Sequence, residues 1–275
     1  MRQNDLQSEV NNDGKKTVQT EDKKKTKAKR SRGVVVYMII RFFVWLFYPK
    51  IKVVGAENLP EEGCMVIGNH SQMNGPIAME LYFPGKRMIW CVGEMMNMKE
   101  APDYAFRDFW SDKPGWIRWF YRILSYIIAP LSYCIFNNAH CIGVYHDKRS
   151  IFTFRDTLKY LKNGYRVIVF PEEKKEYNRI LYEFQDGFAD IARLHYKREH
   201  QPLSFVPMYL APRLKTMFLG EPVTYDPGNN WEVEKVRIKE TLMERITKMA
   251  EELPRHRVVP YANLPKKQYP YNRDE

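Results

Sequence analysis

Short apolar runs alternate with amphipathic segments from residue 50 to residue 253. Apolar runs bounded by turn residues predict β-strands, which we expect at 50–55, 64–67, 86–92, 141–145, 165–170, 204–210 and 217–220, the last at an edge of the sheet. Apolar residues at helical spacing predict helices at 77–82, 151–162, 184–198 and 231–253. The order strand, helix, strand over 141–170 is typical of a βαβ unit. The pattern predicts an α/β fold with a mostly parallel central sheet flanked by helices.

The last predicted helix, 231–253, is amphipathic. Its apolar positions predict the packing face, formed by Val233, Val236, Leu242, Ile246 and Met249. The following segment, 254–275, shows little periodicity, so we expect an irregular strap there.

Two longer apolar stretches stand outside this alternation. Residues 33–48 are apolar on nearly every face, but the stretch is shorter than the ~20 residues of a membrane span and contains Arg41. We expect a membrane-associating helix at 33–49 that lies in one leaflet, with a buried core helix as the alternative. A signal peptide is disfavoured because no small-residue cleavage site follows.

The second stretch, 116–136, is interrupted by Pro130. It is too interrupted to suggest a span, so we expect a core helix here. Its Trp, Tyr and Arg content also suits an interfacial surface or the wall of an acyl-chain groove.

Composition narrows the class of protein. With 275 residues and a formal net charge of +11, the chain suits one large domain with anionic partners. Residues 1–32 are polar and end in a basic run, which predicts a disordered tail. We expect no nucleic-acid partner, because no recognition motif follows that run. The four dispersed cysteines, Cys64, Cys91, Cys134 and Cys141, fit reduced thiols in a cytosol-facing protein and predict no metal site.

Polar clusters follow three of the predicted strands. Asn69 and His70 come after the strand at 64–67, residues 146–149 follow the strand at 141–145, and residues 172–175 follow the strand at 165–170. In a parallel sheet these ends meet at one edge, where ligands bind. A base, several cations and a carboxylate in one crevice suit a substrate that carries a phosphate and a hydroxyl.

The order and spacing of these clusters resemble the glycerol-phosphate and lysophospholipid acyltransferases, the family that includes lysophosphatidate acyltransferase. Asn69 and His70 match the first motif, Asn-His followed by four residues and Asp. Residues 143–149, a Gly-led strand with a basic end, resemble the second motif, and Phe170-Pro171-Glu172 with Lys175 resembles Phe-Pro-Glu-Gly-Thr-Arg. Val206-Pro207 matches the fourth motif.

The resemblance implies acyl transfer from acyl-CoA or acyl carrier protein to a lysophospholipid or glycerol-phosphate-like hydroxyl, in phospholipid synthesis at the cytoplasmic face of a membrane. His70 would be the general base. The acceptor would be bound by Glu172, Lys175, Arg149 and Lys148, with Asn69, Asn74 and Pro171 in support. No metal or bound organic cofactor would be needed, and an anionic membrane surface would be a partner.

One position departs from the first motif. Gly75 stands where the family has Asp. The partner that orients His70 could then be Asn74, Gln72, Asp103 or Asp108, and Gly75→Asp is a test of whether a missing carboxylate limits the site. The alternative is a membrane-associated lipid-binding protein of the same fold with weak or no catalysis.

Overall fold

The computed structural model describes residues 33–274, and the tail predicted at 1–32 lies outside them. The core of the chain is a mixed, mostly parallel sheet with the strand order β1-β9-β8-β2-β5-β3-β4, and β10 pairs with β8. Its strands are β1 (Lys52–Val54), β2 (Cys64–Gly68), β3 (Arg87–Val92), β4 (Cys141–Val144), β5 (Arg166–Val169), β8 (Ser204–Ala211), β9 (Thr216–Leu219) and β10 (Val223–Thr224). The α/β prediction is confirmed.

The direction of the strands decides where their carboxyl ends lie. Along the order β8-β2-β5-β3-β4 each strand is parallel to the next, whereas β9 and β10 pair with β8 in the antiparallel direction. The carboxyl ends of the strands from β8 to β4 in this order therefore meet at the same edge of the sheet, as predicted. Strand β9 pairs with β8 on one side and with β1 on the other. The prediction of an edge strand at 217–220 was wrong, because β1 covers that side of β9.

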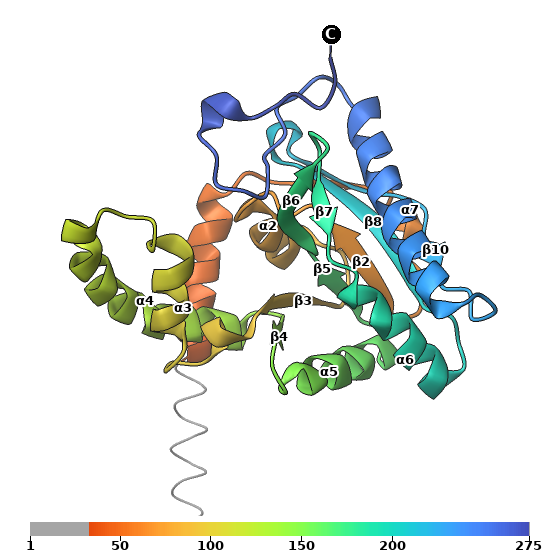
Figure 1. Cartoon of the computed structure of the whole chain (residues 1–275), viewed down its shortest axis with the longest axis horizontal. Helices are drawn as coiled ribbons and strands as arrows, with labels where there is room; N and C mark the ends of the chain where they lie inside the picture. The colour runs from red at the N-terminus through yellow and green to blue at the C-terminus, as the bar shows by residue number, and fades with distance from the viewer. Residues whose placement is uncertain (1–32, 275) are drawn as a thin grey trace, which may run out of the picture. The chain divides into compact units, whose positions relative to one another are not determined.

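Helices cover both faces of the sheet (Figure 1). The principal ones are α2 (Asn74–Tyr82), α5 (Ser150–Lys162), α6 (Asp190–Glu199) and α7 (Trp231–Glu252). Residues of α5, α6 and α7 share one buried cluster with sheet residues such as Met65 and Val167. On the other face α2 contributes Ala78 and Met79 to a second cluster.

Helix α7 packs through part of the predicted face, since Leu242 and Ile246 are buried and Met249 packs against the core. Its buried residues recur at every fourth position: Glu234, Ile238, Leu242, Ile246 and Ala250. Val233 and Val236 were wrongly predicted to pack, since they are 64% and 41% exposed. The difference has a chemical cause, because Glu234 takes a buried position in which it accepts hydrogen bonds from Arg237 and from the Asp226 backbone N–H.

Helix α4 (Arg118–Asn138) is not the core helix that we expected. Together with the turn before it, it forms a helix over Gly115–Asn138 that is long and apolar enough to cross a membrane. Only 17% of its most apolar stretch of 18 residues is buried. Pro130 lies inside it without ending it. The preceding helix α3 (Ala101–Phe109) packs with it through Ala101, Met95 and Ala129.

Residues Gly33–Phe47 form an apolar helix, which belongs to a separate compact unit of the chain. Large apolar side chains along it, including Val35, Ile39, Phe43 and Phe47, are exposed. The helix is therefore present where the sequence predicts one, and membrane association remains a prediction.

One small element escaped the sequence pattern. Strands β6 (Glu172–Tyr177) and β7 (Tyr182–Phe184) form an antiparallel hairpin outside the main sheet. The start of the predicted helix at 184–198 is in fact the end of this hairpin and a turn. Strand β6 begins with charged residues, so its sequence has no strand-like alternation.

Candidate active site

His70 lies in the loop that joins the carboxyl end of β2 to helix α2. The residue before it, Asn69, is 2% exposed and fastens this loop to strand β8. The Asn69 side chain donates to the Leu210 carbonyl at 3.0 Å and accepts from the Leu210 N–H at 2.7 Å. Asn69 therefore acts as a bridge between two strands, and its position fixes the point at which His70 leaves the sheet.

The backbone after His70 is held in an unusual conformation. Ser71 and Gln72 have φ values of 47° and 54°, in the left-handed region, which costs of order 1–3 kcal/mol for residues other than glycine. Several hydrogen bonds offset this cost. The Gln72 amide donates to the Ala262 carbonyl and to the Tyr269 hydroxyl, and the Asn74 amide donates to the Ser71 carbonyl. Strain that is maintained in this way is typical of functional loops.

Glu172 holds the same loop from the neighbouring strand. It follows β5 through Pro171, whose carbonyl accepts a hydrogen bond from the Gln185 N–H. The Glu172 carboxylate accepts from the His70 backbone N–H at 2.7 Å and from the Tyr182 N–H at 3.0 Å. Burial raises the pKa of Glu172 to about 7, although both backbone donors act in the opposite direction. Glu172 thus contacts the backbone of His70 and not its ring.

The His70 ring is enclosed by aromatic side chains. Its centroid lies 5.1 Å from that of Phe170 and 5.5 Å from that of Tyr261, both in edge-to-face geometry. Among the described residues, no hydrogen-bond partner reaches the buried Nδ1 atom. Burial lowers the pKa of His70, while the backbones of Gln72 and of His70 itself act to raise it. Burial therefore favours the neutral form of the ring.

None of the four predicted partners hydrogen bonds to the His70 ring. Gln72 and Asn74 are used to hold the loop, and Asp103 pairs with Arg122 on an exposed surface. Asp108 affects the site through Tyr261. Burial is the largest cause of the raised pKa of Tyr261, and the charge of Asp108 is the second largest. Tyr261, which packs against the His70 ring, is therefore also influenced by the Asp108 carboxylate.

Gly75 occupies a position where the backbone leaves no room for a side chain. Its N–H donates to the His70 carbonyl at 3.0 Å. A Cβ atom at Gly75 would lie 2.4 Å from that carbonyl oxygen and 3.1 Å from the Phe170 ring. An aspartate here would collide with the residue that it was expected to orient.

We therefore expect Gly75→Asp to destabilise the protein by about 1–3 kcal/mol, the usual cost of overpacking, and to leave acyl transfer no faster. The matched control is Gly187→Asp, where an added Cβ meets nothing within 4 Å. Urea unfolding of both variants measures the difference in the free energy of unfolding. A rise in turnover in Gly75→Asp would show that the loop adapts and that a carboxylate was missing.

The predicted cations lie elsewhere on the same edge. Lys148 and Arg149 follow β4, which is separated from β2 by β5 and β3, a distance of about 14 Å at ~4.8 Å per strand. Lys148 is exposed, and Lys175 on strand β6 is exposed and paired with Glu173.

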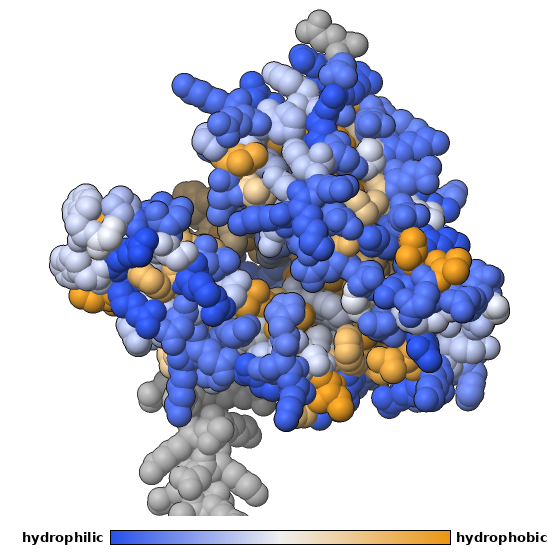
Figure 2. Space-filling model, viewed as in Figure 1, coloured by the Kyte–Doolittle hydropathy of each residue, from blue (hydrophilic) through white to orange (hydrophobic). Residues whose placement is uncertain are grey.

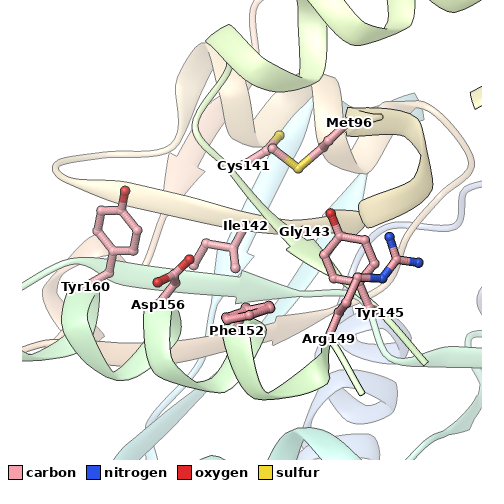
Figure 3. A pocket seen from close by; sticks show the side chains of 9 residues that line it. All are labelled: Met96, Cys141, Ile142, Gly143, Tyr145, Arg149, Phe152, Asp156 and Tyr160. Atoms are coloured by element: carbon pink, nitrogen blue, oxygen red, sulfur yellow. The ribbon is translucent and has the colours of Figure 1, made fainter. Parts of the chain in front are cut away.

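Arg149 lines a cavity of about 270 Å³ between β4 and α5 (Figure 3). Its guanidinium lies over the Tyr145 ring, 4.2 Å from the centroid, and pairs with Glu100 and Asp147. Asp156 also lines the cavity. An incoming phosphate would have to compete with these carboxylates for Arg149.

The sequence pattern missed the contribution of the C-terminal segment. Tyr261, Ala262 and Tyr269 all contact the His70 loop, although 254–275 shows no periodicity. Only its aromatic content could have drawn attention to it. Within residues 33–274 there is no group of three or more His, Cys, Asp or Glu side chains that could hold a metal ion.

No protein-family model and no curated protein matches this chain. Among solved structures, the chain is similar to the 1-acyl-sn-glycerophosphate (LPA) acyltransferase PlsC from Thermotoga maritima. The two sequences are 18% identical, the match covers 82% of this chain and 81% of that chain, and the TM-score is 0.46. At this TM-score the similarity is not evidence for a function.

Proposed function

We propose that this chain transfers a fatty acyl group from acyl-CoA or acyl carrier protein to the hydroxyl of a lysophospholipid or glycerol-phosphate-like acceptor, in phospholipid synthesis at the cytoplasmic face of a membrane. The observation that carries the proposal is the placement of His70. It leaves the carboxyl end of a parallel strand in a strained loop, and Glu172 fixes its backbone. The first motif match, Asn69-His70, falls on this loop, and Glu172 of the third match accepts a hydrogen bond from it.

The chemistry requires a neutral imidazole. The acceptor hydroxyl attacks the thioester carbonyl while His70 takes its proton, so that the new C–O bond forms without a free alkoxide. The C–S bond then breaks, and the imidazolium returns the proton to the departing thiolate. Lys148, Arg149 and Lys175 would pair with the acceptor phosphate.

The experiment mixes purified protein with acyl-CoA or acyl carrier protein and lysophosphatidate, and measures free thiol and diacylated product. The same lysolipid with its free hydroxyl methylated is the matched control acceptor. Product with the first acceptor only is the expected result. No transfer to any lysophospholipid or to glycerol 3-phosphate, with either donor, would overturn the proposal.

A second function is favoured by the unpartnered Nδ1 atom of His70 and by Gly75. A lipid-binding protein that has lost the chemistry would not need a partner on the imidazole. Binding of lysophosphatidate without thiol release would support this function.

The pH profile of kcat/KM tests the state of His70. A base works in its neutral form, and burial lowers the pKa of His70 below its usual 6.5. The acid limb of the profile should therefore have its midpoint below pH 6.5, so that activity at pH 6.5 is more than half of its maximum. An acid limb with its midpoint at or above pH 6.5, or an NMR titration of His70 in that range, would contradict the assignment.

A further inference from the structure

Helix α4 carries its large apolar side chains on the outside. A stripe of exposed residues runs along it through Trp116, in the turn before the helix, and then Trp119, Phe120, Ile123, Ile127 and Leu131. Trp116 is 78% exposed and Ile127 is 66% exposed. These positions are three or four residues apart, so they share one face of the helix.

The opposite face of α4 is made of small residues. Ser125, Ala129 and Ser132 are its buried positions. Ala129 packs with Met95 and Ala101, and the Ser132 hydroxyl donates to the Met95 carbonyl. Small residues let helices approach closely, while a helix that faces water normally turns its large apolar residues inward. This helix has the reverse arrangement, which indicates that its outer face does not face water.

The distribution of charge along α4 matches a lipid surface. The run from Ile123 to Phe136 contains no charged residue. Lys113, Arg118 and Arg122 gather near the amino end, beside Trp116 and Trp119. Tryptophan and cations at the rim of an apolar surface suit the headgroup region, where the cations meet lipid phosphates. A contact with a second copy would not require this order of apolar, aromatic and cationic positions.

The connections of α4 exclude a crossing of the bilayer. Its carboxyl end is two residues from β4, and α3 leads back toward β3 in the same sheet. If α4 crossed, the turn with Asp112 and Lys113 would have to pass to the far side, and α3 would return with Asp103, Arg107 and Asp108 in the hydrocarbon. Charged residues there are costly, about 2.5–3.5 kcal/mol each on insertion scales.

We infer that α4 lies along the surface of a phospholipid bilayer, with the stripe from Trp116 to Leu131 at the boundary between headgroups and acyl chains. The face that Figure 2 shows is mainly hydrophilic, with separate hydrophobic patches, one of them on the α3–α4 lobe. This docking is distinct from any membrane contact of the helix Gly33–Phe47. It holds whether or not the chain transfers acyl groups.

The test is flotation of the full chain with vesicles of phosphatidylcholine and phosphatidylglycerol. The variant Ile123→Ser/Ile127→Ser removes two exposed apolar residues, which should not disturb folding. The control Val233→Ser/Val236→Ser removes two exposed valines from α7. Both pairs are also combined with Phe42→Ser/Phe43→Ser, so that helix Gly33–Phe47 does not mask the result.

We expect the α4 variant to bind vesicles at least about tenfold more weakly than the control, since it removes two large apolar side chains from the contact with lipid. Circular dichroism checks that both variants are folded. Equal vesicle binding by the α4 variant and the control would overturn the inference. A wild-type dimer that Ile123→Ser/Ile127→Ser converts to a monomer in lipid-free sedimentation, with vesicle binding unchanged, would assign the stripe to a second copy instead.

Discussion

Replacing His70 with alanine is expected to lower kcat for acyl transfer by about 10²–10⁴-fold, the usual contribution of a general base. The acceptor hydroxyl would then lose its proton to water only. KM for the acceptor should change little, because the imidazole has no part in holding the phosphate. Steady-state kinetics with acyl-CoA and lysophosphatidate give both quantities.

His146→Ala is the matched control, since His146 is exposed and follows β4 on the same edge of the sheet. Its kcat should equal that of the wild type. The pH profile adds a second readout, because the residual activity of His70→Ala should lack the acid limb. If His70→Ala keeps more than a tenth of the wild-type kcat, another group removes the proton.

Replacing Glu172 with alanine is expected to lower the free energy of unfolding by about 2–4 kcal/mol. The His70 and Tyr182 backbone N–H groups would both lose their acceptor, and each unsatisfied buried donor costs about 1–3 kcal/mol. The His70 loop would also lose its link to β6, so we expect kcat to fall by about 10²-fold, as displacements near 1 Å do elsewhere. Urea unfolding and steady-state kinetics measure the two effects.

The loss of stability should depend on pH. Burial raises the pKa of Glu172 to about 7 from its usual 4.5, so the folded state holds this proton more tightly than the unfolded state. The contribution of the carboxyl is therefore full below pH 4.5 and decreases as the pH rises toward 7. The difference between wild type and Glu172→Ala should be larger at pH 5 than at pH 8.

The control for Glu172→Ala is Glu173→Ala. Glu173 pairs with the exposed Lys175, and a surface pair of this kind contributes about 0–1 kcal/mol. A loss of equal size in both variants would show that the two backbone hydrogen bonds are not what the carboxyl provides. A Glu172→Ala loss that does not change with pH would show that the pKa of Glu172 is not raised in the folded state.

The strands of the sheet could be predicted because the burial of each strand is apparent from its own apolar residues. Strands β2, β5 and β8 are buried on both faces, and such strands are continuous apolar runs. The βαβ unit predicted that β4 and β5 are parallel, and the prediction of a mostly parallel sheet placed Asn69, His70 and Glu172 at one edge. The part of the site that lies at the strand ends could therefore be predicted from the sequence.

The remaining features depend on distant contacts that leave no local pattern. Glu172 accepts a hydrogen bond from the His70 backbone N–H, which is 102 positions away. The residues that follow it in the sequence are charged, so residues 172–175 resemble a solvated loop when only the sequence is considered. The apolar content of 116–136 predicted a core helix, but it could not reveal that the large apolar side chains of α4 are exposed. Nor could a spacing rule show that Gly75 lies against the His70 carbonyl.

The hydrogen bonds that join Gln72 to Ala262 and Tyr269 span 190 and 197 positions of the chain. Contacts of such separation form late, because a long loop must close before they can stabilise anything. During synthesis the sheet strands around β2 and β5 are made well before residues 261–269. The His70 loop therefore receives these supports only after residues 261–269 have been made, so a nascent chain that ends before them would hold the strands of this site but not yet its final geometry.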